Sequence, residues 1–229
     1  MPAPPARWFV VVVAVAAAIG LPGVAPAQEP AERIQESARY TFDPADLPAV
    51  PGAAYELDLT LATFLRGHWD SRSMFSAARE AAEILAQCGV RTARVELRVI
   101  DAPRHYRFYF TPVSRRLARA LPLPRPVAYF ADDTLNQPAF DAEAIGRGNG
   151  RTRPELVGTV WLTHGVREPG VALAHELAHV LMDSGAHSED AGNLMRVETA
   201  AANTRLDPMQ CARLTLVGAQ QGLLRTLPR

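Results

Sequence analysis

The sequence contains no lysine: its 24 basic residues are all arginine, and 24 acidic residues balance them. The formal net charge at pH 7 is therefore zero. A chain without net basic charge lacks the electrostatic footprint of a nucleic-acid-binding protein. We interpret its one local basic cluster as a solvated face, formed by Arg115, Arg116, Arg119 and Arg125. We therefore expect no nucleic-acid partner.

Cysteine is also scarce, since the 229 residues include only Cys88 and Cys211. Two cysteines so far apart exclude a structural zinc site built on four cysteines. In an oxidising compartment they are expected to pair and to join the ends of two helices. Closing a loop of roughly 120 residues would contribute about 4 kcal/mol to stability. Two free buried thiols are the alternative.

Long apolar stretches are confined to the N-terminus, at Trp8–Gly20. Arg7 precedes this stretch, and the small-residue sequence Ala25–Ala27 follows it, as in a secretory signal with its cleavage site. The stretch is shorter than the ~20 residues of a spanning helix, which argues against an uncleaved anchor. We predict that residues 1–27 are a signal peptide. The mature protein is then secreted or periplasmic, without stable membrane insertion.

Residue patterns beyond the signal predict one α+β domain over 53–229, after a polar, mobile lead-in over 28–52. Alternating polar and apolar residues predict strands, and apolar residues at helical spacing predict helices. This order indicates a twisted mixed sheet with an early helix, a helix carrying histidines, and a C-terminal helix. The expected strands cover 55–64, 92–100, 106–110, 126–130 and 155–163; the expected helices begin at Ser71, Pro169 and Pro208; residues 131–154 are expected to form a loop.

Two histidines and a glutamate form an H-E-x-x-H motif within the middle helix. His175 and His179 are four residues apart, so they lie on one helix face, one turn apart. This separation lets two imidazole nitrogens reach one zinc ion. Glu176 projects beside the ion, where it can take a proton from a zinc-bound water and pass it to a leaving nitrogen. The motif therefore predicts a zinc site with its own proton carrier.

The surroundings of the motif favour a metal over ordinary core histidines. Val171, Leu173, Leu177, Val180 and Leu181 make this helix apolar almost all round, which indicates that it is buried. A plain apolar core would leave two imidazoles and a carboxylate without polar partners, at high cost. A metal explains all three polar groups at once.

A catalytic zinc takes three protein ligands and keeps a fourth position open. His187 is the leading candidate for the third ligand, because a left-handed Gly185 would turn the chain back toward the metal. Glu198 is the main alternative, since its spacing from His179 matches zinc peptidases that take a glutamate from the next helix. The oxygen ligands that compete with His187 are Asp183, Glu189, Asp190 and Glu198.

The segment "HELAHVLMDSGAHSEDAGNLM", residues 175–195, resembles the active-site signature of the metzincin clan, especially its matrixin branch. That signature is H-E-x-x-H-x-x-G-x-x-H followed by a methionine turn. The resemblance implies a metzincin-like fold, zinc bound by the three histidines, and Met195 as an apolar floor beneath the ion. Two departures are clear: Met182 replaces the family glycine, and the corner before His187 is two residues longer.

The resemblance also implies an edge strand that pairs with extended substrate, at Gly158, Thr159 and Val160. His164, which follows this strand, is expected in a loop near the cleft. Asp132 and Asp133 are candidates for a calcium site, although a solvated turn is the preferred interpretation. His68 and His105 are given no role.

The sequence thus predicts an exported zinc-dependent endopeptidase acting on peptide or protein substrates. One alternative is a zinc peptidase that uses Glu198 as a ligand. The other is a catalytically silent, exported metal-binding module of the same fold.

Overall fold

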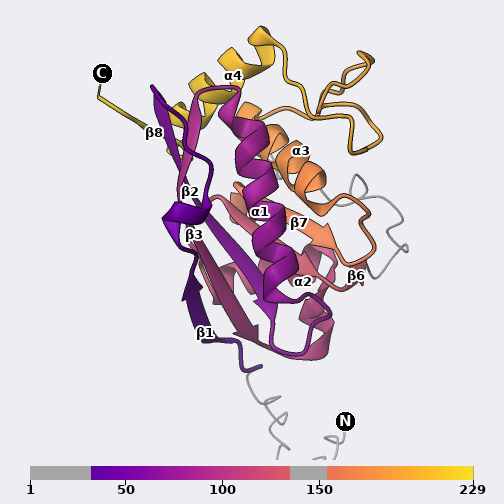
Figure 1. The fold of residues 1–229 in the computed structure, drawn as a ribbon. Coiled ribbons are helices and arrows are strands. Elements are labelled where there is room, and N and C mark those ends of the chain that lie inside the picture. The colour runs from indigo at the N-terminus through magenta and orange to yellow at the C-terminus, as the bar shows by residue number, and fades with distance from the viewer. Residues whose placement is uncertain (1–31, 135–153, 229) are drawn as a thin grey trace, which may run out of the picture. The chain divides into compact units, whose positions relative to one another are not determined.

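A mixed sheet forms the framework that carries the histidine helix (Figure 1). The computed structural model describes residues 32–134 and 154–228. Within these residues, β2, β3, β5 and β7 run parallel to one another, β1 is antiparallel to β3, and the short β8 is antiparallel to β2. The strand order is β1 (Gln35–Thr41), β3 (Val90–Asp101), β2 (Tyr55–Phe64), β5 (Val127–Ala131) and β7 (Thr159–Thr163), with β8 (Arg225–Thr226) beside β2.

Helices cover both faces of the sheet. On one face lie α1 (Ser71–Ala86) and α3 (Pro169–Met182), which contact each other, and α4 (Pro208–Gln220) packs against α3 (Figure 1). The other face carries α2 (Thr111–Ala120). A two-stranded sheet pairs β4 (Phe108–Tyr109) with β6 (Asp133–Thr134), and 3-10 helices cover Pro44–Asp46, Arg104–Arg107 and Pro154–Leu156. The observed class is the predicted one: one α+β domain with a mixed sheet.

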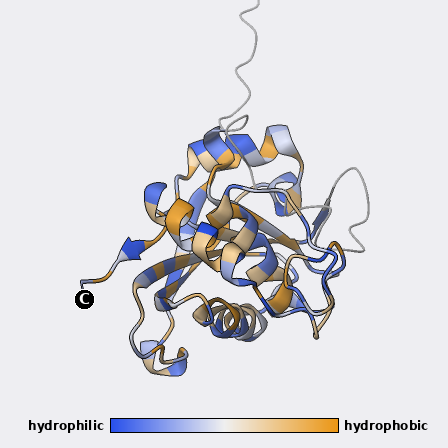
Figure 2. Cartoon of the chain, turned by 90° about the horizontal axis from the view of Figure 1, so that it is seen from above, coloured by the Kyte–Doolittle hydropathy of each residue, from blue (hydrophilic) through white to orange (hydrophobic). Residues whose placement is uncertain are grey.

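Alternation along the strands divides the hydrophobic residues between two cores. Val160 and Leu162 of β7 belong to the larger core beneath α1 and α3, whereas Trp161 belongs to the smaller core beneath α2. This follows from the two-residue period of a strand, because successive side chains point to opposite faces. Along the helices, hydrophobic and hydrophilic residues are interspersed (Figure 2). The histidine helix therefore packs on the larger core.

The predicted lead-in over 28–52 is wrong in one respect, because residues 35–41 form strand β1. This strand is polar and mostly exposed, so it lacks the apolar alternation that marks a strand. Pairing with β3 and an ion pair between Glu36 and Arg98, 2.7 Å long, hold it in place. The predicted signal peptide lies outside the described residues and stays a prediction.

Other differences concern short elements. The proline-rich connection after residue 110 contains helix α2, whose Val113 and Leu117 lie four apart and face the smaller core. The strand expected at 106–110 is reduced to β4, and the strand expected at 155–163 begins only at Thr159. Strands β2, β3 and β5 and helices α1, α3 and α4 confirm the predictions. No helix among the described residues is both long enough and apolar enough to cross a membrane.

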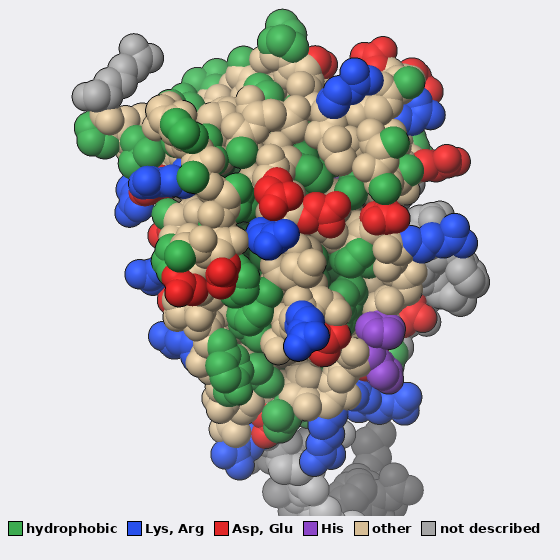
Figure 3. Space-filling model, in the orientation of Figure 1, with side chains coloured by type: hydrophobic (Ala, Val, Ile, Leu, Met, Phe, Trp, Pro, Cys, Tyr) green, Lys and Arg blue, Asp and Glu red, His purple; other side chains and the backbone are tan. Residues whose placement is uncertain are grey.

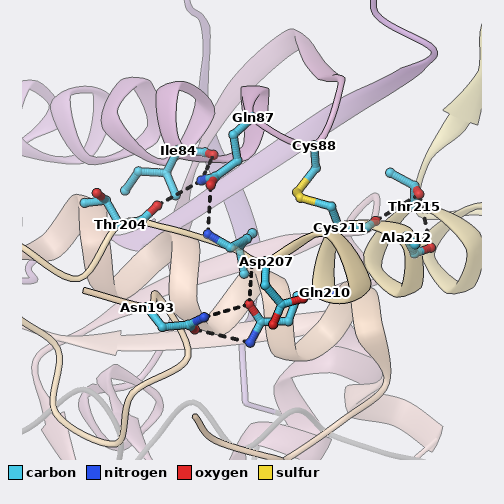
Figure 4. Close-up of a disulfide and its surroundings, with 11 residues drawn as sticks. Ile84, Gln87, Cys88, Asn193, Thr204, Asp207, Gln210, Cys211, Ala212 and Thr215 are labelled. Carbon is cyan, nitrogen blue, oxygen red and sulfur yellow. Dashed lines mark hydrogen bonds between the residues drawn. A yellow bond between two sulfur atoms is a disulfide. The ribbon is translucent and has the colours of Figure 1, made fainter. Parts of the chain in front are cut away.

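The predicted disulfide is present and joins Cys88 to Cys211, with their Cα atoms 4.9 Å apart (Figure 4). Cys88 follows the end of α1, and Cys211 lies in the first turn of α4. The bridge therefore ties together two helices that both lie beside α3. The side chain of Gln87 also links the end of α1 to the segment before α4. It donates to the Thr204 carbonyl and accepts from the Leu206 N–H.

Candidate metal centre

Three imidazole rings converge on one point beside α3. The Nε2 atom of His179 lies 2.9 Å from Nε2 of His175 and 3.3 Å from Nε2 of His187. One ligand atom from each ring lies within 4.8 Å of the other two. Zinc–nitrogen bonds of ~2.0–2.1 Å in a tetrahedron place the nitrogens about 3.3 Å apart. The structure thus brings together the three histidines singled out in the sequence, at separations that suit one tetrahedral ion.

Helix α3 positions the first two of these rings. It is buried along nearly its whole length, and His175 and His179 are 0% and 5% exposed. Their four-residue spacing places them one turn apart, with ring centroids separated by 4.5 Å. His187 comes from the chain beyond the helix and is exposed. The centre therefore has two buried ligand candidates and one at the surface.

Backbone carbonyls fix the tautomers of the two helix histidines. His175 Nδ1–H donates to the Leu194 carbonyl at 2.7 Å, and His179 Nδ1–H donates to the Ser184 carbonyl at 2.6 Å. Because a carbonyl can only accept, the proton must sit on Nδ1 in each ring. Each Nε2 therefore keeps its lone pair and points it at the shared centre, as metal-ligating histidines require.

Burial also keeps these rings neutral. Burial, together with the neighbouring His179, lowers the pKa of His175 to about 4. Burial likewise lowers the pKa of His179, more strongly than the Ser184 carbonyl raises it. At neutral pH both rings are thus in the unprotonated form that binds metals.

The corner after α3 differs from the sequence prediction. The left-handed residue is Asp183, with φ of 46° and ψ of 52°, whereas Gly185 is not in the left-handed region. The helix ends at Met182, so the reversal falls two residues earlier than expected, and aspartate tolerates this conformation better than most side chains. Arg213 of α4 donates to the carbonyl of Met182 and thereby caps the helix. The lengthened corner contributes Ser184, the residue that orients His179.

The oxygen ligands considered as alternatives lie outside the cluster. Among the described residues, the group whose ligand atoms lie within 4.8 Å comprises the three histidines alone. The geometry therefore favours His187 over Glu198 as the third ligand.

This preference predicts a difference in zinc content. The His187→Ala protein should lose zinc on dialysis, because removing a direct ligand costs more than the roughly 10–100-fold loss of affinity seen for outer-shell partners. The Glu198→Ala protein should retain zinc at the wild-type ratio. Metal analysis of both dialysed proteins decides the matter, and the reverse pattern would assign the third ligand to Glu198.

Met195 and Glu176 are both buried, at 1% exposed each. Met195 lies in the larger core, where its backbone N–H donates to Asn193 Oδ1 and its carbonyl accepts from the Ser188 N–H. Its position beneath the ion stays a prediction from the resemblance. Glu176 follows His175 on the helix and is not a member of the histidine cluster.

The residues of the predicted substrate strand lie away from solvent. Gly158 precedes β7, while Thr159 and Val160 belong to it and are 1% exposed. Strand β7 pairs with β5 in parallel along one edge. Binding of substrate along its other edge stays a prediction.

His68, His164 and Asp132 are not members of the histidine cluster. His68 and His164 are exposed with ring centroids 5.6 Å apart, and Figure 3 shows neighbouring histidine side chains on one face, where acidic and basic groups are interspersed. Asp132 accepts from the His68 N–H and lies 3.5 Å from Arg107. These contacts favour a structural role for Asp132 over a calcium site.

Two residues near the centre have no counterpart in the sequence prediction: Asn193 and Gln210. Their side-chain amides hydrogen bond to each other and so link residue 193 to α4. The only sequence signal is the capping-box spacing of Asp207 and Gln210, which predicts a helix start and says nothing about Asn193.

Comparison with known proteins gives little further information. No protein family matches the chain, and no curated protein does. Among solved structures, it is similar to metalloproteinase-II from Bacteroides fragilis, with 16% sequence identity and a TM-score of 0.46. The match covers 72% of this chain and 54% of the other, so this chain spans about half the length of that neighbour. Similarity at this level does not assign the chain to a family.

Proposed function

We propose that this protein is an exported zinc-dependent endopeptidase of metzincin type. The observation that carries the proposal is the convergence of three Nε2 atoms, with a buried glutamate, Glu176, directly after His175 on α3. The choice of a peptide substrate rests on the resemblance of residues 175–195 to the metzincin signature. The disulfide is compatible with export, because such bridges persist in oxidising compartments.

The donor set fits zinc. His175 and His179 have both committed their Nδ1 protons to carbonyls, so their Nε2 lone pairs face each other at 2.9 Å. Two lone pairs at this distance repel unless a cation lies between them. Three nitrogen ligands would leave one position of a four-coordinate zinc open, which is the arrangement of catalytic rather than structural zinc sites.

Zinc and the residues around it have separate roles in the proposed hydrolysis. When bound, zinc activates water and polarises a peptide carbonyl as a Lewis acid. Glu176 takes the proton that the attacking water loses and delivers it to the leaving amine nitrogen. Its burial keeps bulk water from competing for that proton, while Leu194 and Ser184 hold the imidazoles in place.

The catalytically silent alternative is weaker because of Glu176. A purely structural metal site has no use for a buried carboxylate beside its ligands, and burying such a group is costly. A carboxylate directly after the first histidine of the helix is, in contrast, suited to carry a proton from the attacking water to the leaving nitrogen.

Hydrolysis of denatured casein by the purified mature protein tests the proposal. We expect cleavage that a chelator abolishes and added zinc restores, together with about one zinc per chain. Zinc-free protein that still hydrolyses casein would overturn the zinc mechanism. Zinc-loaded protein without activity on casein or other unfolded proteins would favour the silent module.

A further inference from the structure

The side-chain amides of Asn193 and Gln210 form a reciprocal hydrogen-bonded pair (Figure 4). Asn193 Nδ2 donates to Gln210 Oε1 at 3.0 Å, and Gln210 Nε2 donates to Asn193 Oδ1 at 3.2 Å. Asn193 is 5% exposed, so the pair is shielded from water on one side. The two residues are 17 positions apart in the sequence.

Backbone groups determine how each amide is oriented. Asn193 Oδ1 also accepts from the Met195 N–H at 2.8 Å, and Gln210 Oε1 also accepts from the Asp207 N–H at 2.9 Å. Because a backbone N–H can only donate, both oxygens must face these groups, which leaves both NH₂ groups facing the partner amide. The pair therefore has one satisfied arrangement, because flipping either amide breaks both hydrogen bonds between the amides and one from a backbone N–H.

The segment held by Asn193 in turn holds two of the three histidines. The Leu194 carbonyl accepts from His175 Nδ1 at 2.7 Å. The Met195 carbonyl accepts at 2.7 Å from the N–H of Ser188, the residue directly after His187. Residues 193–195 are thus linked to the His175 ring by one hydrogen bond. They are linked to His187 through a hydrogen bond to the next residue, Ser188.

The other half of the pair sits on a rigid support. Gln210 is the third residue of α4, and together with Asp207 it forms the capping box that starts the helix. The next residue, Cys211, is bonded to Cys88 at the end of α1. The pair therefore connects residues 193–195 to the capped first turn of α4.

We propose that the Asn193–Gln210 amide pair is a positioning device for the metal centre, in which Gln210 sets the placement of His175 and His187 through residues 193–195. The proposal rests on the zinc site proposed above. It assigns Gln210, which touches neither metal nor substrate, a role in zinc affinity beyond its role in capping α4.

The substitution Gln210→Glu separates these two roles. Glutamate is a standard residue at this position of a capping box, so its carboxylate still accepts from the Asp207 N–H. Its second oxygen, however, replaces an NH₂ donor and faces Asn193 Oδ1. Either Asn193 Oδ1 then lies against a carboxylate oxygen of the introduced glutamate without a proton between them, or the Asn193 amide flips and loses the hydrogen bond from the Met195 N–H. We expect α4 to stay intact while the methionine turn loses its anchor.

Asn203→Asp is the matched control. Asn203 is 8% exposed and donates to the Glu198 carbonyl at 2.8 Å, so this variant also exchanges a buried amide for a carboxylate and loses a donor. The hydrogen bonds of Asn203 go to Glu198 and Ala200 rather than to residues 193–195. We expect this substitution to lower the melting temperature and to leave zinc affinity unchanged.

Zinc affinity is measured on the full mature proteins by competition with a chromophoric chelator, and ligand geometry by the visible spectrum of the cobalt-substituted forms. We expect Gln210→Glu to weaken zinc binding by about tenfold, at the lower end of outer-shell effects, and to alter the cobalt spectrum. If the glutamate variant does not fold, Gln210→Met gives the same readout without a new charge.

The outcomes separate this inference from the proposed function. Wild-type protein that binds no zinc overturns both. Wild-type protein that binds zinc, with a Gln210→Glu protein of equal affinity and spectrum, overturns the positioning role alone. An equal loss of affinity in Asn203→Asp would reduce the effect to general destabilisation and would also overturn it.

Discussion

Replacing Glu176 with glutamine is expected to abolish peptide hydrolysis while the protein keeps its zinc. Glutamine has the shape of glutamate, so the substitution changes little in the buried space beside His175. It cannot take a proton from the attacking water, and general-base catalysis typically contributes about 10²–10⁴-fold to the rate. We therefore expect kcat/KM to fall by at least about 100-fold, with the zinc content of the dialysed protein unchanged.

Glu83→Gln is the matched control, since it makes the same exchange on α1 at a side chain that is 53% exposed. Its kcat/KM and zinc content should equal those of the wild type. A Glu176→Gln protein that kept most of its zinc-dependent activity would exclude Glu176 as the proton carrier. A Glu176→Gln protein that lost its zinc would show instead that the carboxylate supports the metal site.

The metal centre was largely predictable because its core is local in sequence. His175, Glu176 and His179 lie within five residues on one helix, and helical spacing alone places two of them on one face. His187 follows closely enough that a short corner brings it back to the same point. The corner itself was mispredicted, because glycine is the usual left-handed residue and the sequence offers Gly185, while the helix ends at Met182.

The features that escaped prediction depend on contacts between distant segments. Strand β1 is polar, and what holds it is pairing with β3 and the contact of Glu36 with Arg98, 62 residues away. The pair of Asn193 and Gln210 likewise depends on how α4 lies against the segment that contains Asn193. Polar residues of this kind leave no apolar period in the sequence, so their role is decided by tertiary structure.

Removal of the disulfide is expected to lower the free energy of unfolding by about 4–5 kcal/mol, because it releases a loop of 123 residues in the unfolded chain. Such a loss is a large share of the ~5–15 kcal/mol that stabilises a typical domain. Denaturant unfolding of the Cys88→Ala/Cys211→Ala protein measures it. Both proteins are compared without zinc, since a bound metal adds its own stabilisation.

Reductant provides the control for this measurement. It should destabilise the wild type to the level of the double variant and leave the double variant unchanged. A difference below about 1 kcal/mol between the two proteins would mean that the unfolded chain gains little freedom when the bridge is cut, contrary to the loop-closure argument.

Zinc affinity distinguishes the disulfide from its neighbour Gln210. The loop-closure effect acts on the unfolded chain, so the folded double variant keeps the capping box, the amide pair and the Leu194 carbonyl that orients His175. Under conditions in which both proteins are fully folded, the zinc affinity of the double variant should therefore stay close to that of the wild type. Cys211 and Gln210 are adjacent in the chain, yet loss of the first should change mainly stability and loss of the second mainly metal binding.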